Sequence, residues 1–516
     1  FFSPPAMQPP LSSVPVRFTS AGYKDVLWAV LFLLQLCVVV AVGLNVAQQI
    51  NWDSDTVFDG TDGTEDFKIP ASISYSLITS VILSAVMGTL MMLILNACAS
   101  YFIWVSNALQ ILFSGAFALI AFAVGDVATA LFLGLLCTIN VVWLWCVWQR
   151  IPFASVMLQA ACEVAYSNIA TVFVTYFGVA LQVTYFTFWV LTVAAMWDSA
   201  SPPVQVMLVL MLFWSWQVLQ NVVHVTITGV ACTWYFMSRN MPSYPTLGAL
   251  RRSLTSSFGS ICLGSLVVAL LQLLRAIASS GKASDGSVTF MGSCFACLLD
   301  WIEASMEYFN QYAYVQVAMY GKSFVQASKD TWSLVKDCGI SALINDSLIS
   351  RTLMLTVFLA SIAVGILAPL PFQDPEWTWY ALEVFLGFLI ALFILSSFLK
   401  VVHSSIQAIF VCYAEQPEVL QVTNPKLASE LHDAVAYMNS SRPATSAPLL
   451  PGPMGPMFPG QAPPVYGPPP GYGAPQPPAA WGYSAPPGYG AAQGVPLGYG
   501  APQGGPAYPP PHGPVA

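Results

Sequence analysis

The sequence predicts an all-α polytopic membrane protein with about ten transmembrane helices and a disordered C-terminal tail. Of its 516 residues, 56% are hydrophobic and 8% are charged, whereas an ordinary soluble domain has about 25% charged residues. The charges are also widely spaced, since none lies between Lys68 and Asp126 or between Asp198 and Arg239. Gaps of this kind hold apolar segments of about 20 residues, the length of helix that crosses a bilayer.

Charge-free gaps place six of the predicted helices. With the charged residues that bound each gap, they are 73–95 and 101–123 (Lys68 to Asp126), 127–148 (Asp126 to Arg150), 205–237 (Asp198 to Arg239), 255–277 (Arg252 to Arg275) and 351–370 (Arg351 to Asp374).

Four further segments are long and apolar enough to be predicted as spans, namely 26–47, 169–194, 295–320 and 379–402. The segment 295–320 is interrupted by Asp300, Glu303 and Glu307. It is therefore predicted either to cross the bilayer or to lie at its surface as an amphipathic helix.

The basic residues predict the orientation, because they stay on the cytoplasmic side of a membrane. With both termini in the cytoplasm, thirteen of the sixteen basic residues are on the inner side and the outer loops are acidic. An acidic outer mouth attracts cations, although a solvated loop that avoids positive charge is the alternative. We expect no nucleic-acid partner, and the acidity argues against an anionic substrate.

Three regions follow from this layout: a cytoplasmic N-terminal segment over 1–24, a transmembrane domain over 25–435 and a cytoplasmic tail over 436–516. Residues 443–516 contain no Asp, Glu, Lys or Arg, are rich in Pro and Gly, and repeat GYG three times. Such a composition cannot bury a core and predicts disorder. The tail is either a solvated tether or a ligand for proline-recognition proteins.

No cofactor and no metal site is predicted. Cys294 and Cys297 form a CxxC motif, but no second pair completes a zinc site. Gly321, Lys322 and Ser323 resemble the end of a phosphate-binding loop, yet position 316 holds glutamine where the first glycine is required.

The segment QVLQNVVHVTITGVACTWYF, residues 217–236, contains the candidate substrate-binding residues. At steps of three and four along a helix, one face carries Trp214, Gln217, Asn221, His224 and Thr228, and Tyr235 continues it. Polar groups in hydrocarbon are expensive, so they are kept where they face the bundle interior, a water-filled path or a ligand. For His224 the alternatives are proton coupling, substrate orientation or a hydrogen bond to a neighbouring helix.

Other polar residues lie in the last predicted span. Glu383 is a candidate counter-charge for an organic cation, with an interfacial partner as the alternative. Lys400 and His403 are expected to reach towards the cytoplasmic surface.

Five sequence stretches together resemble the choline transporter-like solute carriers, including their fungal and protist branch, the pH nine sensitive proteins. They are RIPFA at 150–154, NVVHVTITGVACTWYF at 221–236, RRSLTSSFGSICLGSLVVALLQLLR at 251–275, NQYAYVQVAMYGKSFVQASKD at 310–330 and AIFVCYAEQPE at 408–418. The resemblance implies a ten-helix plasma-membrane protein with both ends in the cytoplasm. Animal members carry choline, and some carry ethanolamine. The segment 51–70 is short and has no glycosylation sequon, which favours the fungal and protist branch.

These observations predict a plasma-membrane transporter of choline or a related small organic cation, facilitative or proton-linked, and not an enzyme. Choline cannot donate hydrogen bonds from its quaternary ammonium, so its recognition relies on aromatic faces such as Trp214. The alternatives are a channel or lipid-moving protein without choline specificity and an intramembrane acyltransferase using His224 with Asn221.

Overall fold

The computed structural model describes residues 22–49, 71–197, 199–237, 240–280, 290–338, 341–372 and 377–440. All of them belong to one unit, Phe1–Met454. The predicted N-terminal segment up to residue 21, the loop 51–70 and the tail from 441 onward lie outside the described residues.

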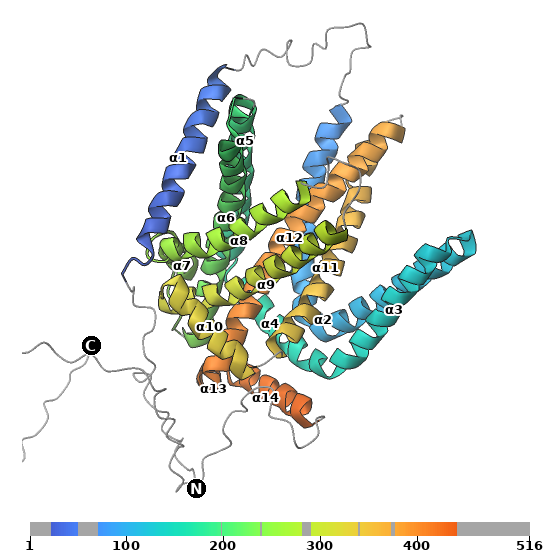
Figure 1. Ribbon diagram of the computed structural model, residues 1–516. Coiled ribbons are helices and arrows are strands. Elements are labelled where there is room, and N and C mark those ends of the chain that lie inside the picture. Colours follow the sequence, from blue (N-terminus) through green and yellow to red (C-terminus); the bar gives the residue numbers. More distant parts are fainter. Residues whose placement is uncertain are drawn as a thin grey trace, which may run out of the picture. The chain divides into compact units, whose positions relative to one another are not determined.

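The described residues contain helices and no strand. The α-helices (Figure 1) are α1 (Val26–Gln49), α2 (Ala71–Val124), α3 (Val127–Val147), α4 (Ile151–Ser167), α5 (Ala170–Met196), α6 (Pro202–Met237), α7 (Pro245–Leu254), α8 (Phe258–Ser280), α9 (Phe290–Tyr320), α10 (Phe324–Cys338), α11 (Ser341–Leu367), α12 (Trp377–Glu415), α13 (Pro417–Thr423) and α14 (Pro425–Ser440).

Eight helices of the described chain are long and apolar enough to cross a membrane. They are α1, α2, α3 with its continuation into α4, α5, α6, α8, α11 and α12. Nine of the ten predicted segments lie in these helices, extending at most three residues past a helix end, and α2 contains two of them, 73–95 and 101–123. The all-α polytopic class is confirmed, whereas the tenth segment, 295–320, lies in α9, which is not among the eight.

Helix α2 is longer than any single predicted span. Its 54 residues form two helical parts, each of about 40 Å at 1.5 Å per residue and so long enough to cross the hydrocarbon core. The backbone departs from helical geometry at Cys98 (φ −135°, ψ 32°), between the two predicted spans. The second part of α2 pairs with α3 (Figure 1).

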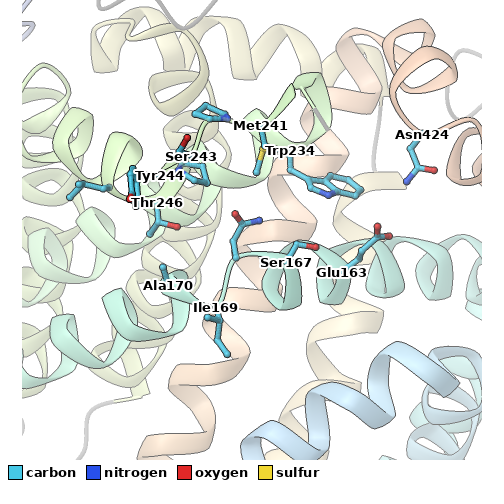
Figure 2. Close-up of a pocket in the computed structure, with 14 residues that line it drawn as sticks. Glu163, Ser167, Ile169, Ala170, Trp234, Met241, Ser243, Tyr244, Thr246 and Asn424 are labelled. Atoms are coloured by element: carbon cyan, nitrogen blue, oxygen red, sulfur yellow. The ribbon is translucent and has the colours of Figure 1, made fainter. Parts of the chain in front are cut away.

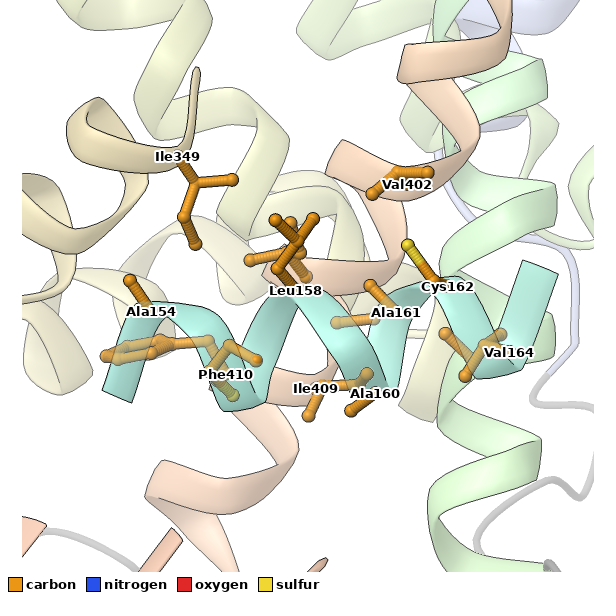
Figure 3. Packing of buried hydrophobic residues seen from close by; sticks show 14 of the residues in the cluster. Ala154, Leu158, Ala160, Ala161, Cys162, Val164, Ile349, Val402, Ile409 and Phe410 are labelled. Carbon is orange, nitrogen blue, oxygen red and sulfur yellow. The ribbon is translucent and has the colours of Figure 1, made fainter. Parts of the chain in front are cut away.

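Helix α4 was not predicted, because its 17 residues are too few to span a bilayer and include Gln159 and Glu163. It is nevertheless buried in the main hydrophobic cluster and packs against α2 and α12. Figure 3 shows α4 side chains such as Leu158 and Ala161 facing Val402 and Phe410 of α12. Small alanines along α4 let the neighbouring helix approach closely.

Helix α6 lies at the centre of the helix packing and contacts α5, α7, α8, α9 and α12. Every residue from Asn221 to Phe236 is buried. Its polar groups must therefore find partners inside the protein.

Asp25 joins the beginnings of three helices. Its backbone lies in the left-handed region (φ 54°), which Asp tolerates better than most residues. Its Oδ2 accepts hydrogen bonds from the Ser260 hydroxyl of α8 (2.7 Å) and the Phe324 backbone N–H of α10 (2.9 Å). Next to it, the Lys24 N–H donates to the Ser256 carbonyl (3.3 Å), so α1 begins tied to both α8 and α10.

Candidate functional site

A cavity of about 550 Å³ lies between α6, α9, α11 and α12. Its described lining residues divide into a polar and an apolar group. The polar group is Gln220, Asn221, His224, Glu307, Gln311, Ser350, Ser396, Lys400, His403 and Ser404, and the apolar group is Leu353, Met354, Val357, Phe358, Leu392 and Leu399.

Helix α6 contributes the two predicted residues Asn221 and His224. The Asn221 amide donates to the Ser265 hydroxyl of α8 at 3.0 Å. His224 Nε2 lies 3.0 Å from the Gln311 carbonyl oxygen and Nδ1 lies 2.8 Å from the Ser404 hydroxyl. A carbonyl can only accept, so Nε2 carries a proton and donates to it, and Nδ1 shares a hydrogen bond with the Ser404 hydroxyl. His224 thereby joins α6 to α9 and α12.

Charged residues of opposite sign line the same cavity. Glu307 projects from α9 and Lys400 from α12, and their opposite charges attract each other. The Lys400 ammonium donates to Gln220 Oε1 at 3.1 Å. Lys400 also lines a small side cavity between α5, α6 and α12. The described lining of the cavity thus includes one carboxylate and one ammonium group among other polar side chains.

The remaining polar residues continue this network on α11 and α12. His403 Nε2 lies 3.1 Å from the Ser350 hydroxyl, and Gln407 donates to Gln311 Oε1 at 2.8 Å. In each of these pairs the two residues come from different helices, so hydrogen bonds join α12 to α9 and α11 on the polar side of the cavity.

The apolar side of the cavity comes mainly from α11. Met354 and Phe358 lie one turn apart, and they are 75% and 47% exposed. Phe358 is the one Phe, Tyr or Trp among the described lining residues. This cavity therefore does not supply the several aromatic faces expected of a quaternary ammonium site.

The other predicted residues of the α6 face lie outside this cavity's lining. The Trp214 indole N–H donates to the Cys262 carbonyl at 2.9 Å, and its ring packs edge-on against Phe32 with centroids 5.4 Å apart. Thr228 donates to the His224 carbonyl one turn earlier. The Tyr235 hydroxyl donates to the Gln416 carbonyl at 2.9 Å. Gln217 is buried on the same helix.

Glu383 also lies outside the lining of this cavity, although it is on α12. Its side chain is fully buried. Within the described part of the chain, neither carboxylate oxygen has a hydrogen-bond partner. An unpaired buried carboxylate is costly, so Glu383 remains a candidate for pairing with a cation.

Glu307, Gln311, Lys400 and His403 were not predicted as site residues. The sequence predicted that Lys400 and His403 reach towards the cytoplasmic surface, but both line the cavity. Their spacing offered a signal, since Ser396, Lys400, His403 and Ser404 share one face of a helix. Among the described residues, no group of three His, Cys, Asp or Glu is arranged to hold a metal ion.

Comparisons with known proteins agree with the sequence motifs. Residues 131–418 match a family described as plasma-membrane choline transporter. A CTL-like protein of Dictyostelium discoideum is 30% identical over 442 residues, which cover 80% of this chain and 75% of that protein.

Two fungal relatives are named Protein PNS1. That of Yarrowia lipolytica is 31% identical over 368 residues, covering 64% of this chain and 64% of the relative. That of Debaryomyces hansenii is 34% identical over 315 residues, covering 54% of this chain and 61% of the relative. The chain spans less than two thirds of both fungal proteins.

Proposed function

This chain belongs to the plasma-membrane choline transporter family, and from that premise we propose that it carries choline or a related small organic cation across the plasma membrane. The membership supports a membrane transporter rather than an enzyme. Transport is facilitative or linked to protons, and both termini are cytoplasmic, as the distribution of basic residues favours.

The cavity between α6, α9, α11 and α12 is the observation that carries this proposal. It brings Asn221 and His224 together with the Glu307 carboxylate. Glu307 supplies a counter-charge for an organic cation, and the Asn221 side chain supplies a hydrogen bond to a hydroxyl or amino group of the substrate. Both ring nitrogens of His224 are held by Gln311 and Ser404, so His224 bonds to the substrate only by exchanging one of these partners.

Lys400 gives the site a resident cation. Because Lys400 and Glu307 line the same cavity, a cation that approaches Glu307 meets the ammonium of Lys400. In the proposed cycle the substrate replaces Lys400 as the positive charge next to Glu307, while Lys400 keeps its hydrogen bond to Gln220. Two positive charges at close range repel each other, so this exchange favours a substrate that is bound transiently.

Uptake into vesicles that contain the purified full-length chain tests the proposal. Radiolabelled choline, ethanolamine and an unrelated organic cation are compared, with and without a pH gradient. Glu307→Gln is expected to reduce cation uptake at least tenfold, whereas Glu430→Gln is the matched control, because Glu430 is on the peripheral α14 and pairs loosely with Lys426 (3.9 Å). The proposal fails if the wild type takes up none of the cations, or if both variants transport alike.

A lipid-moving activity is the second candidate, and the exposed Met354 and Phe358 favour it. They form an apolar side of the cavity on the outside of the helices, where a lipid tail would remain in hydrocarbon while its headgroup meets the polar residues. Scrambling of a fluorescent phosphatidylcholine by the same vesicles, without uptake of free choline, would favour this function over the first.

A further inference from the structure

A second cavity, of about 750 Å³, lies where α4 and α6 end and α7 begins. Its described lining shares no residue with the cavity between α6, α9, α11 and α12. Figure 2 shows the Trp234 indole of α6 projecting between Met241 and Asn424, with Glu163 and Ser167 on neighbouring turns of α4. The space is large enough for a small organic molecule.

The cavity carries a negative charge that the described chain leaves unbalanced. Glu163 is exposed to it and makes no hydrogen bond or ion pair with a described residue. The described lining contains no Lys or Arg. A carboxylate in such surroundings is available to a cation from solution.

Helix ends of both polarities border this cavity. The last turns of α4 (ending at Ser167) and α6 (ending at Met237) border the cavity, and the C-terminal end of a helix carries about half a negative charge. Helices α5 (from Ala170), α7 (from Pro245) and α14 (directly after Asn424) begin at the same cavity with the opposite polarity, so the helix ends do not decide the sign of the local field. The preference for a positive ligand comes from Glu163, the one charged residue in the described lining.

Aromatic groups complete the arrangement. Trp234 and Tyr244 both line the cavity. Trp234 is 5% exposed, whereas Tyr244 is 77% exposed, so the Tyr244 ring is free to lie against a ligand. The first cavity has Phe358 alone in this role among its described residues. A quaternary ammonium cannot donate hydrogen bonds and depends on aromatic faces and a nearby carboxylate. The second cavity meets these requirements better than the first.

We propose that this cavity is a second binding site for the transported organic cation, in which a quaternary ammonium lies against Tyr244, beside the largely buried Trp234, with Glu163 as its counter-charge. The identity of the ligand rests on the proposed transport function. The two cavities are then successive binding sites for the substrate. One lies among the spanning helices, and the other lies at the end of the helices that the basic residues assign to the cytoplasm.

Equilibrium binding of radiolabelled choline to the purified full-length chain in detergent tests this site. The wild type is expected to bind two molecules per chain. Glu163→Gln is expected to weaken one of them about tenfold, which corresponds to about 1.4 kcal/mol, and to leave the site containing Glu307 intact. Glu430→Gln serves as the control, because it removes an exposed carboxylate that belongs to neither lining.

The aromatic contribution has its own readout. Tyr244→Leu is expected to weaken choline binding at least threefold more than ethanolamine binding, because a primary ammonium can still donate hydrogen bonds to Glu163. Tyr244→Phe keeps the ring and is expected to bind choline as the wild type does. Because Tyr244 is exposed, none of these changes removes a core side chain.

The results separate this proposal from the transport function. If choline is transported but only one molecule binds, and Glu307→Gln abolishes that binding, the second site is refuted and the transport function stands. Unchanged binding in both Glu163→Gln and Tyr244→Leu refutes it as well. If the wild type neither transports nor binds any of the organic cations, both proposals fall.

Discussion

His224 offers the sharpest separation of a substrate-binding role from a structural one. It makes two hydrogen bonds, to the Gln311 carbonyl (3.0 Å) and the Ser404 hydroxyl (2.8 Å). A buried hydrogen bond contributes about 1 kcal/mol net, and a group left unsatisfied costs about 1–3 kcal/mol. His224→Ala removes both bonds, so we expect the protein to lose about 2–4 kcal/mol of stability.

Two further variants separate the contributions of the two hydrogen bonds to stability. The amide of Asn ends near the position of Nδ1, so His224→Asn is expected to keep the bond to Ser404. The amide of Gln extends to the position of Nε2, so His224→Gln is expected to keep the bond to the Gln311 carbonyl. Each variant should regain about 1 kcal/mol relative to Ala, one bond's contribution.

Transport measured per folded molecule then gives the functional part. If the substrate replaces Gln311 or Ser404 at a ring nitrogen of His224, the Ala variant loses that hydrogen bond in the complex, which corresponds to roughly a fivefold to tenfold decrease in apparent affinity. The assay combines thermal unfolding in detergent with vesicle uptake normalised to folded protein. Normal uptake by all three variants, with only their stability lowered, would refute a substrate contact at this residue.

Three other substitutions test separate features. Trp214→Phe is expected to retain the edge-on contact with Phe32 but to lose the bond to Cys262, lowering stability by about 1 kcal/mol with uptake unchanged; decreased uptake at unchanged stability would instead place Trp214 on the substrate path, as the sequence suggested. Glu383→Gln is expected to raise the unfolding temperature, because it neutralises a buried carboxylate without a partner; uptake that falls while stability rises would assign Glu383 to cation binding. Gly259→Ala is expected to lower the yield of folded protein severely, since an added Cβ would lie 2.3 Å from the Lys24 carbonyl oxygen and 2.4 Å from that of Asp25; a normal yield and unfolding temperature would contradict the close approach of α1 and α8.

The spanning helices could be predicted because the bilayer sets their length and apolarity, as for α1, α5 and α8. The break in α2 lies where the two predicted spans meet, since the backbone leaves helical geometry at Cys98, between 73–95 and 101–123. Its local cause could not be predicted, because no Pro or Gly lies at this point in the sequence. Helices α4 and α7 were missed because their burial or surface position depends on packing, and neither is long enough to span.

The α6 face could be predicted from helical spacing alone, and two of its members, Asn221 and His224, line the cavity. The rest of the site comes from α9, α11 and α12, whose approach to α6 is a tertiary property. Glu307 illustrates the difficulty. From the sequence it only interrupted an apolar segment, and its place opposite Lys400 depends on how α9 and α12 pack.

The carboxylate of Asp25 has a mechanical consequence. Because one side chain holds the starts of both α8 and α10 to the beginning of α1, these three helices are expected to rotate as a single rigid body during a transport cycle. The opposite wall, made by α11 and α12, packs against α2, and α12 also contacts α6 and α4. Hydrogen bonds from Lys400 to Gln220 and between Ser404 and His224 join α12 to α6. A movement of α1, α8 and α10 relative to α12 therefore either breaks these hydrogen bonds or leaves α6 with α12.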